Sequence, residues 1–558
     1  MWRVTDSTRA VGGDRLCALM VLGVISLILI LGSLAESRVY SELGKIEYPA
    51  INCRKHSASL KDFGGVGDGK TSNTKIFQSA ISKLSQYASD GGATLIVPPG
   101  KWLTGPFNLT SHFTLFLQKD AIILASQEEM IPMEGQNGTI DGQGSYWWNK
   151  FHKKQLSLTR PFMIEIMYSD QIQISDLTLV NSPNWFVHPV YSSNIIVKGL
   201  TILAPVDSPN TDGINPDSCT NTRIEDCYIV SGDDCIAAKS GWDEYGIKFG
   251  KPTQHLVIRR VTCISPDSAM VALGSEMSGG IDDVRVEDLT AINTESAVRI
   301  KTAVGRGGFV KNIFVRGLNL NTMKYVFWTT GSYGAHPDPN YDPKALPIVT
   351  GINFKDVVAK NVTISAQLEG ISKDPFTGIC ISNVTIEVNE LKKKKLQWNC
   401  TDVAGATNNV TPPPCALLPQ KDKTDCAFPD DKLPIEAVQF KTCLHQRILD
   451  LHTDLHQRVS DLPLVVAPDV FQPLKHFEWD HLLLEEEAVA DGAVNGERRS
   501  CYGWSREWWK KKLQTLQRQR QCEVLAASLK TVGLVVGRWR KEEGKGISRK
   551  KKKEGKEV

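Results

Sequence analysis

The sequence predicts an all-β protein, a parallel β-helix covered at its N-terminal end by one capping helix. Three observations support this fold class. An eight-residue pattern recurs eight times between residues 172 and 386. Equivalent positions in successive copies are 23 to 39 residues apart, which suits one coil of a β-helix with loops of varied length. An amphipathic helical segment precedes the first copy.

The repeated octet has apolar residues at positions 1, 3, 6 and 8 with polar residues between them. Alternation, a two-residue break and renewed alternation describe two short strands joined by a bend. The copies are IQISDLTL (172–179), IIVKGLTI (195–202), TRIEDCYI (222–229), LVIRRVTC (256–263), VRVEDLTA (284–291), IFVRGLNL (313–320), INFKDVVA (352–359) and ICISNVTI (379–386). A β-sandwich also has short alternating strands, but it does not repeat one octet eight times.

The third position of each octet should belong to one ladder of stacked side chains. One coil cannot bury its inward side chains alone, so each must lie on the equivalent residue of the next coil. The ladder residues are Ile174, Val197, Ile224, Ile258, Val286, Val315, Phe354 and Ile381.

The segment from Thr74 to Tyr87 is expected to form the capping helix. Its apolar residues fall on one helical face: Ile76, Phe77, Ala80, Ile81 and Leu84. A solenoid needs such a cover because its end otherwise exposes unpaired strand groups.

Composition excludes several classes of protein. The chain has 558 residues, of which 23% are charged and 41% hydrophobic, as in ordinary globular proteins. This excludes wholesale disorder, a collagen-like fibre and a polytopic membrane protein. The net charge of +3 is too balanced for a dedicated nucleic-acid binder.

Residues 1–35 are predicted to be a secretory signal peptide. An uncharged apolar run at 16–34 follows three arginines and ends near Ser-Leu-Ala, which resembles a cleavage site. An uncleaved signal anchor is the alternative, since 19 residues can span a membrane. Six Asn-x-Ser/Thr sequons agree with this compartment: Asn108, Asn137, Asn361, Asn383, Asn399 and Asn409.

Most of the ten cysteines from Cys53 to Cys443 are expected to form disulfides in that oxidising compartment. Their pairing cannot be deduced from the sequence. The expected bridge members are Cys219/Cys235 and the C-terminal group Cys400, Cys415, Cys426 and Cys443. Zinc is the weaker interpretation, because no CxxC pair or histidine partner accompanies them.

Three short segments place charged residues close to octets. Asp212 precedes the third octet, Asp233 and Asp234 follow it, and Arg299-Ile300-Lys301 follows the fifth. Equivalent residues of successive coils lie about 4.8 Å apart. Asp212 and Asp233 are 21 residues apart, close to one coil, so their side chains can meet on one surface. A bend can bring Asp234 to the same cleft.

Such a cluster suits hydrolysis of a glycosidic bond. Three adjacent carboxylates cannot all ionise cheaply, so at least one pKa should rise. Opposed carboxylates with unequal pKa values perform acid/base hydrolysis. Arg299 and Lys301 lie on the same side of their strand and can bind an anionic substrate. The alternatives are ordinary turn chemistry and a calcium site with the three aspartates as ligands.

The chain resembles plant members of glycoside hydrolase family 28, the polygalacturonases and their relatives. The segments that carry the resemblance are SPNTDGINPDS (208–218), VSGDDCIAAKSG (230–241) and RIKT (299–302). Supporting matches are DFGGVGDGKTSNTKIFQSAI (62–81), GTIDGQGSYWW (138–148) and SPNWFVHPV (182–190). The resemblance covers residues 45 to 443 and implies a right-handed parallel β-helix with an open cleft that binds pectin.

The resemblance also implies an activity and the residues that perform it. The expected activity is inverting hydrolysis of α-1,4-galacturonosidic bonds in pectin, as part of cell wall carbohydrate metabolism. Asp233 would be the general acid, and Asp212 and Asp234 would activate water. Arg299, Lys301 and Asn210 would bind the sugar.

The expected partner is a pectic polysaccharide, with no nucleic acid, and the expected state is an extracellular monomer. A membrane is involved only if the N-terminal segment stays uncleaved. No cofactor is expected, since the sequence has no phosphate loop, HExxH or paired CxxC.

Three departures from the family pattern leave other functions open. The usual Gly-His-Gly motif should fall within 264–280, where no histidine is present and Ala269 is the expected equivalent. Asp267 and Glu276 are candidate substitutes. Residues 125–136 are about one coil shorter than in relatives, and residues 444–558 are expected to be a disordered or partly helical extension. Hydrolysis of rhamnogalacturonan or xylogalacturonan, and pectin binding without catalysis, are the alternatives.

Overall fold

The computed structural model describes residues 53–126, 134–135, 138–334, 336–339, 341–389 and 397–439. The expectations for residues 1–35, Asn137, Cys443 and residues 444–558 lie outside this part of the chain. Among the described residues, no helix is long and apolar enough to cross a membrane.

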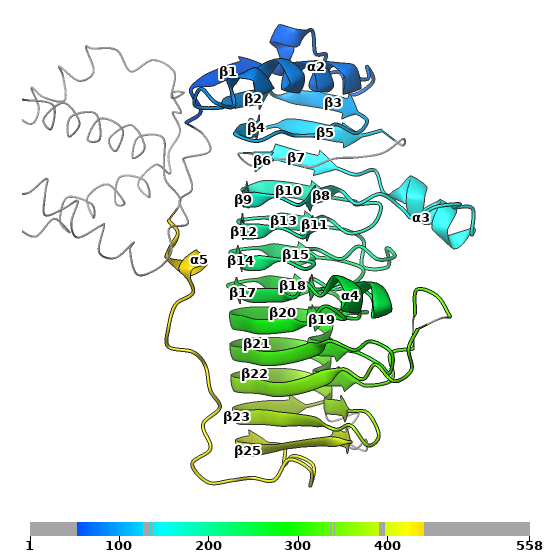
Figure 1. Cartoon of the computed structure of the whole chain (residues 1–558), viewed down its shortest axis with the longest axis vertical. Coiled ribbons are helices and arrows are strands. Elements are labelled where there is room, and N and C mark those ends of the chain that lie inside the picture. Colours follow the sequence, from blue (N-terminus) through cyan, green and yellow to red (C-terminus); the bar gives the residue numbers. More distant parts are fainter. Residues whose placement is uncertain are drawn as a thin grey trace, which may run out of the picture. The chain divides into compact units, whose positions relative to one another are not determined.

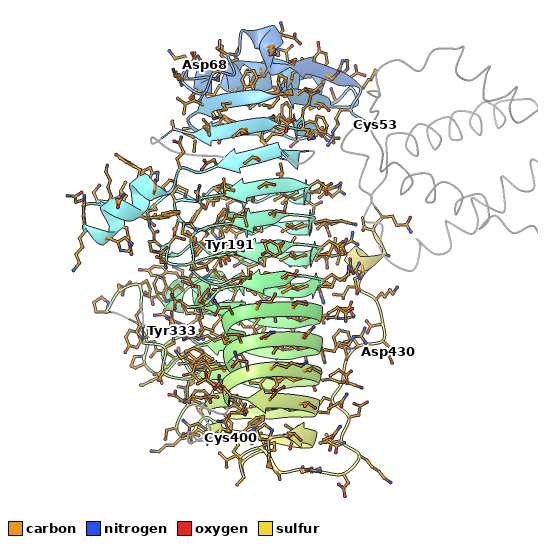
Figure 2. All side chains as sticks on the ribbon, turned by 180° about the vertical axis from the view of Figure 1, so that it is seen from behind. Cys53, Asp68, Tyr191, Tyr333, Cys400 and Asp430 are labelled. Atoms are coloured by element: carbon orange, nitrogen blue, oxygen red, sulfur yellow. A yellow bond between two sulfur atoms is a disulfide. The ribbon has the colours of Figure 1, made fainter. Side chains whose placement is uncertain are left out.

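The fold is the predicted all-β, right-handed parallel β-helix. Within the described residues, nineteen strands form one sheet, a second sheet has four strands and a third has two. Figure 1 shows the coils stacked one below another along the axis of this unit. Asp68 lies near the N-terminal end of the stack and Cys400 near its C-terminal end (Figure 2).

The helices are α2 (Thr74–Leu84), α3 (Ser145–His152), α4 (Asp243–Phe249) and α5 (Pro434–Ala437), with short 3-10 helices at Leu60–Phe63 and Ser85–Tyr87. The strands before the first octet are β1 (His56–Ser59), β2 (Ala93–Val97), β3 (Gly100–Thr104), β4 (Phe113–Leu117), β5 (Ala121–Ala125), β6 (Glu134–Gly135), β7 (Gly138–Asp141) and β8 (Ile164–Met167). The middle coils contain β9 (Asp170–Ser175), β10 (Leu177–Val180), β11 (Val187–Val190), β12 (Ser193–Lys198), β13 (Thr201–Leu203), β14 (Thr220–Glu225), β15 (Tyr228–Val230), β16 (Ile236–Ala238), β17 (Thr253–Arg259), β18 (Thr262–Ile264) and β19 (Ala269–Leu273). The last coils contain β20 (Ile281–Lys301), β21 (Phe309–Thr330), β22 (Ile348–Glu369), β23 (Phe376–Val388), β24 (Trp398–Thr401) and β25 (Val403–Thr411).

The predicted ladder at the third octet position is confirmed. Ile174 pairs with Val197, and the parallel pairing continues from coil to coil until Ile381. All eight side chains are at most 3% exposed. The ladder then extends to Thr407 in β25, a coil that the octet pattern did not reveal. Thr407 is buried because its hydroxyl donates to the carbonyl of Leu418 at 3.1 Å.

The bend in every octet is one residue in the left-handed conformation. The fifth octet position has φ between 50° and 69° in all eight copies: Asp176, Gly199, Asp226, Arg260, Asp288, Gly317, Asp356 and Asn383. Glycine, asparagine and aspartate tolerate this conformation better than other residues. Arg260 is the exception, and its Nε donates to Oδ1 of Asp226 in the preceding coil at 2.6 Å. The strand thus turns at the same place in each coil.

The helix expected at 74–87 is present as α2 followed by the 3-10 turn Ser85–Tyr87. It buries Phe77, Ala80, Ile81 and Leu84, the face that the sequence predicted, while Ile76 is half-buried. Phe77 stacks on Phe107 with ring centroids 4.5 Å apart. Figure 1 shows α2 beside β2 and β3 at the N-terminal end of the stack.

Strand pairing continues across the shortened segment at 125–136. Ile123 of β5 pairs with Ile140 of β7, and Ile140 pairs with Leu179 of β10. Residues 127–133 lie outside the described part of the chain. The coils on either side of the segment therefore contact each other directly.

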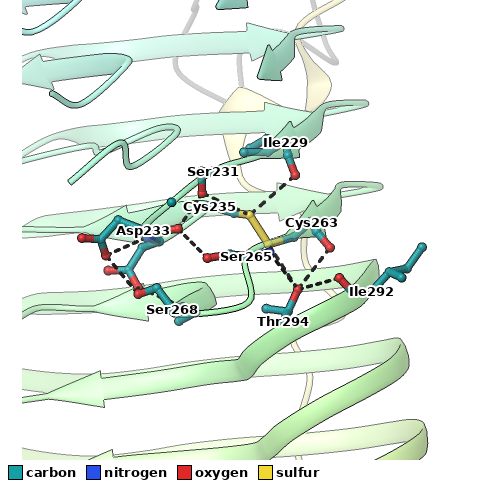
Figure 3. The surroundings of a disulfide bond; sticks show 12 residues. Ile229, Ser231, Asp233, Cys235, Cys263, Ser265, Ser268, Ile292 and Thr294 are labelled. Atoms are coloured by element: carbon teal, nitrogen blue, oxygen red, sulfur yellow. Dashed lines mark hydrogen bonds between the residues drawn. A yellow bond between two sulfur atoms is a disulfide. The ribbon is translucent and has the colours of Figure 1, made fainter. Parts of the chain in front are cut away.

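The expected disulfide membership is partly wrong. Cys219 is a buried free thiol, and Cys235 is bridged to Cys263. The reason is the register, because Cys263 ends the fourth octet and so points into the core beside Cys235 (Figure 3). The C-terminal members are bridged as expected, in the pairs Cys400–Cys415 and Cys380–Cys426.

The segment after β25 returns along the stack and ends at α5. The side chain of Arg223, on β14, is 2% exposed, and its Nη1 donates to the carbonyls of Ile435, Glu436 and Val438 at 2.7, 3.1 and 2.9 Å. Arg285 likewise donates to the carbonyl of Asp431 at 2.6 Å. We call residues 412–439 the C-terminal strap. Hydrogen bonds from two buried arginines thus join this strap to the middle coils.

Replacing Gly317 by alanine should destabilise the protein by about 1–2 kcal/mol. Gly317 has φ 69°, and an added Cβ would lie 2.6 Å from Oδ1 of Asp288. Urea unfolding followed by circular dichroism measures the change. The control is Gly334→Ala, where the nearest atom to an added Cβ is 3.9 Å away and no loss is expected. Equal stability of the two variants would contradict the left-handed bend.

Candidate active site

The parallel register places Asp212 and Asp234 in one row. The core residues Val187, Ile214, Ile236, Val271 and Val298 stand opposite one another in successive coils. The residues that lie two positions before each of them occupy equivalent places in successive coils. This first row contains Trp185, Asp212, Asp234, Ala269 and Ser296. The coil equivalent of Asp212 is therefore Asp234, whereas the sequence had suggested Asp233.

Asp233 precedes the row by one residue but still reaches the same place. One carboxylate oxygen each of Asp212, Asp233 and Asp234 lies within 4.8 Å of the others. The expected cluster of three carboxyl groups is present.

Two further rows flank the first. One contains His188, Asn215, Ala237, Ala272, Arg299 and Trp328, and the other contains Asp217, Lys239, Gly274 and Lys301. The cations thus come from different coils and lie beside small residues. The resulting surface has carboxyl groups in its middle and ammonium and guanidinium groups around them.

Asp234 is the ionised member of the cluster. Its Oδ2 accepts a hydrogen bond from Nζ of Lys301 at 2.6 Å, and its Oδ1 accepts from Oγ of Ser268 at 2.6 Å and from the backbone N–H of Ala269 at 3.1 Å. Burial favours a higher pKa for Asp234, but Lys301 and these donors outweigh it and lower the pKa below its usual value. The pKa of Lys301 is raised, because its carboxylate neighbours outweigh its burial.

Asp233 differs from Asp234 in that no lysine or arginine of the described residues forms an ion pair with it. Its carboxylate accepts from Oγ of Ser268 at 3.0 Å and from Nδ2 of Asn210 at 3.3 Å. Burial and the charge on Asp234 raise the pKa of Asp233. Its backbone carbonyl accepts from the hydroxyls of Ser231 and Ser265 at 2.5 and 2.7 Å, beside the Cys235–Cys263 disulfide (Figure 3). The position of Asp233 is therefore fixed by its backbone.

Asp212 is buried and 3% exposed. Its Oδ2 accepts from Nδ2 of Asn215 at 3.2 Å and lies 4.0 Å from Nζ of Lys239. Burial and the neighbouring Asp233 raise its pKa well above the usual value. The expectation that at least one of the three pKa values rises is met by Asp212 and Asp233.

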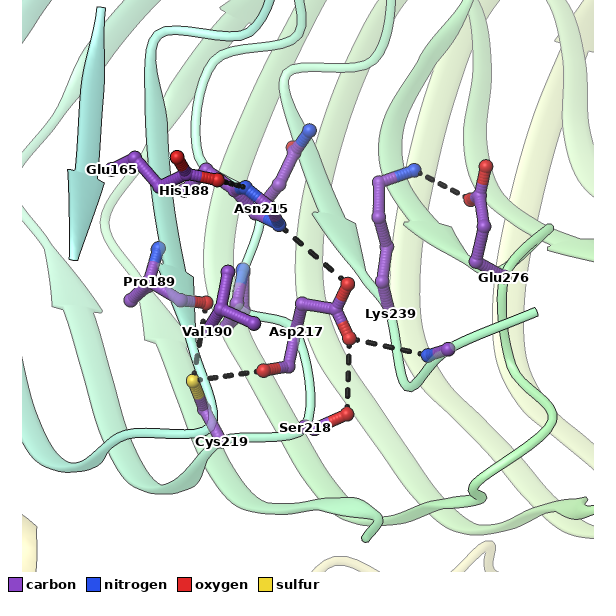
Figure 4. Close-up of polar contacts among 12 residues, drawn as sticks. Glu165, His188, Pro189, Val190, Asn215, Asp217, Ser218, Cys219, Lys239 and Glu276 are labelled. Carbon is purple, nitrogen blue, oxygen red and sulfur yellow. Dashed lines mark hydrogen bonds and ion pairs between the residues drawn. The ribbon is translucent and has the colours of Figure 1, made fainter. Parts of the chain in front are cut away.

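Lys239 forms its shortest ion pair with Glu276: its Nζ lies 2.9 Å from Oε2 of that residue (Figure 4). Lys239 also lies over the ring of Trp185 at 4.4 Å. Glu276 therefore reaches the cluster only through Lys239. Asp267, the other candidate substitute for the absent histidine, is exposed. Ala269 lies beside Asp234 and supplies its backbone N–H.

A histidine that the sequence analysis did not single out lies near the cluster. His188 Nδ1 is 3.3 Å from Glu165 and its Nε2 is 3.6 Å from Asp217 (Figure 4). Burial alone would lower its pKa, but these two carboxylates raise it. Its ring packs edge-on against Trp185 at 4.8 Å. No spacing rule marks His188, because its partners come from neighbouring coils.

Arg299 and Asn210 occupy different parts of the site. The guanidinium of Arg299 stacks on Trp328 at 3.4 Å, and its Nη1 lies 3.5 Å from Glu295. Asn210 lies between two side chains: its Oδ1 accepts from Nη2 of Arg160 at 2.6 Å, and its Nδ2 faces Asp233. The structure thus places Lys301 and Asn210 against the carboxyl groups and Arg299 beside the next coil.

Comparison with known proteins agrees with this geometry. The family described as Glycosyl hydrolases family 28 matches residues 107–411. A relative from Vitis vinifera, described as a probable polygalacturonase, is 59% identical over 464 residues, which cover 76% of this chain and 94% of the relative.

Two solved structures share the fold. An exopolygalacturonase from Thermotoga maritima has a TM-score of 0.53 at 24% identity and covers 69% of this chain and 95% of its own. A family 28 exopolygalacturonase from Yersinia enterocolitica has a TM-score of 0.54 at 17% identity, with coverages of 67% and 77%. At these identities the likeness concerns the β-helix alone. The family match over more than half of the chain, together with the Vitis vinifera relative, shows that this chain belongs to glycosyl hydrolases family 28.

Proposed function

We propose that this protein is a secreted cell wall enzyme that hydrolyses α-1,4-galacturonosidic bonds of pectin by an inverting acid/base mechanism. One observation carries the proposal: three carboxyl groups meet at one place with pKa values displaced in opposite directions. Two carboxyl groups of unequal pKa are what glycoside hydrolysis requires. The name of the Vitis vinifera relative, a probable polygalacturonase, supports the same substrate.

Each carboxyl group has a role that fits its surroundings. Asp233 keeps its proton because burial and Asp234 raise its pKa, so it donates that proton to the leaving glycosidic oxygen. Water then adds to the anomeric carbon as the glycosidic C–O bond breaks. Asp212 and Asp234 hold this water and accept its proton, and the raised pKa of Asp212 makes it the stronger base once ionised.

The cations around the cluster suit a polyanionic substrate. Lys239, Lys301 and Arg299 come from separate coils and lie around the carboxyl groups. Carboxylates of a galacturonan chain are natural partners for such groups. Within the described residues, Lys301 and the donors from Ser268 and Ala269 already neutralise and solvate Asp234, which favours acid/base catalysis over a calcium site.

Asp233→Asn should lower the release of reducing ends from polygalacturonic acid by at least about 100-fold. The variant keeps the shape of the side chain but cannot donate the acidic proton. The assay uses purified protein at about pH 5, because mildly acidic conditions favour the protonated form of a carboxyl group with a raised pKa. Asp288→Asn is the matched control, because Asp288 is an exposed bend residue and the substitution should leave the rate unchanged.

Other outcomes separate the alternatives. Hydrolysis of rhamnogalacturonan or xylogalacturonan, with polygalacturonic acid left intact, would change the substrate and keep the mechanism. Pectin binding without hydrolysis of any of the three polymers would replace the enzyme by a binding protein.

Early products should carry the β-anomeric configuration in proton NMR spectra. Inverting enzymes usually have carboxyl groups roughly 6.5–9.5 Å apart, whereas these oxygens lie within 4.8 Å of one another. This spacing is closer to the roughly 5–5.5 Å of retaining enzymes, so inversion requires Asp212 and Asp234 to hold the water on the face of the sugar opposite Asp233. The α-anomer as the first product would refute inversion while leaving hydrolysis intact.

Asp212→Asn should stabilise the protein at pH 7 by roughly 1–2 kcal/mol. A raised folded-state pKa means that ionised Asp212 opposes folding. The penalty is absent below the unfolded pKa of about 3.9 and grows as the pH rises through the folded-state pKa. Thermal unfolding at about pH 4 and 7 tests this sign.

Asp234→Asn is the control with the opposite sign. The lowered pKa of Asp234 contributes stability above its unfolded pKa, and this stability is lost as the pH falls through the folded-state value. The variant leaves buried Lys301 without its partner, so it should lose about 3 kcal/mol at pH 7. A loss in both variants would contradict the assigned charges.

A further inference from the structure

A cavity of about 480 Å³ opens beside the carboxyl cluster. One wall comes from the end of α3 and the connection after it and includes Phe151, Lys154 and Leu158, and the other includes Asn184, Trp185 and Asn210. This volume lies within the roughly 300–1,000 Å³ that is usual for small-molecule sites. Asn210 connects the cavity to the catalytic groups, because its Nδ2 donates to Asp233 at 3.3 Å.

Asn184 is the polar group that the cavity leaves unsatisfied. Its side chain is 6% exposed, and its Oδ1 has no hydrogen-bond partner among the residues that the structure describes. A buried acceptor without a partner is costly, so such groups usually have a ligand or water. The free oxygen requires a donor, such as a sugar hydroxyl.

The charged side chains that line the cavity are positive, and Lys154 is positioned to bind an anionic ligand. Lys154 is exposed, and no ion pair joins it to another residue within the described ranges. Arg160 also lines the cavity, but its donors are occupied: Nη1 by the carbonyls of Pro183 and Pro209, and Nη2 by Asn210. No aspartate or glutamate is among the described residues of the lining. A carboxylate on the ligand can therefore bind Lys154 without repulsion.

The remaining walls are apolar and partly open to solvent. Leu158 is 83% exposed and Phe151 is 42% exposed, although both are large apolar side chains. The ring of Trp185 stacks on Phe162 with centroids 4.8 Å apart and is held in place. Aromatic and aliphatic walls of this kind pack against the C–H face of a sugar ring.

We propose that this cavity is a subsite for one uronate residue of the substrate, next to the bond that is cut. Oδ1 of Asn184 accepts a hydrogen bond from a sugar hydroxyl, Nζ of Lys154 binds the sugar carboxylate, and Trp185 contacts the ring. Arg160 is a positioning residue: it holds Oδ1 of Asn210 and so turns Nδ2 toward Asp233. The subsite rests on the proposed function and adds the residues that recognise one unit of the polymer.

Calorimetric titration of the full-length Asp233→Asn protein with α-1,4-linked digalacturonate tests the subsite without turnover. Adding Asn184→Ala should weaken binding about tenfold, because one hydrogen bond to a buried acceptor is lost. Adding Lys154→Ala should weaken binding about five- to tenfold and flatten its dependence on salt. Adding Lys153→Ala, the same change at the exposed neighbouring residue outside the lining, should have no effect.

The neutral disaccharide of galactose with the same linkage separates the two contacts. Asn184→Ala should weaken its binding, whereas Lys154→Ala should not, since the ligand has no carboxylate. Digalacturonate that binds both variants as tightly as their parent, or fails to bind the parent at millimolar concentration, overturns the subsite even if hydrolysis is observed. If the unmodified protein does not hydrolyse the polymer but the variants still lose binding as expected, the result contradicts only the proposed function.

Discussion

Stacking in register is the constraint on which the rest of this structure depends. Each octet turns at a left-handed fifth residue, so every coil bends at the same point and presents its third residue to the core. Loops of different length then leave the stack without disturbing it, because the next octet restores the register. The active-site rows exist for the same reason, since residues at fixed offsets from the core ladder must line up on the outside. Asp212 and Asp234 meet although a whole coil separates them along the chain.

The three aspartates owe their different chemistry mainly to their partners, since Asp212 and Asp234 are both buried and yet have pKa values displaced in opposite directions. Asp234 receives an ammonium group, a hydroxyl and a backbone N–H. Asp233 and Asp212 receive mainly neutral donors and lie beside a charged neighbour, which favours their protonated forms. The displacement of the three pKa values in opposite directions thus follows from the placement of Lys301 next to only one of the carboxyl groups. Asn210 then connects this centre to the cavity in which we place a uronate unit.

Sequence periodicity predicted the features that repeat and missed those that do not. The core ladder and the gathering of Asp212, Asp233 and Asp234 follow from the octet spacing, and the helix at 74–87 follows from the helical spacing of its apolar residues. Ser268, Arg160 and His188 lie in connections or rows without a motif, so only the fold brings them to the site. The alignment of Asp212 with Asp234, in place of Asp233, depends on a shift of one residue within a coil. Such a shift cannot be read from spacings when the loops between coils vary in length.

The C-terminal strap has a consequence for synthesis on the ribosome. A solenoid can in principle fold coil by coil as it emerges, since each coil contacts only its neighbours. Here Arg223 and Arg285, which belong to middle coils, donate to backbone carbonyls in residues 431–438, among the last of the described chain to be made. Until that segment is made, these long-range hydrogen bonds of two buried side chains cannot form. The middle coils therefore complete their contacts only after residues 431–438 have been made. Folding during synthesis must then finish with a contact between residues far apart in the sequence.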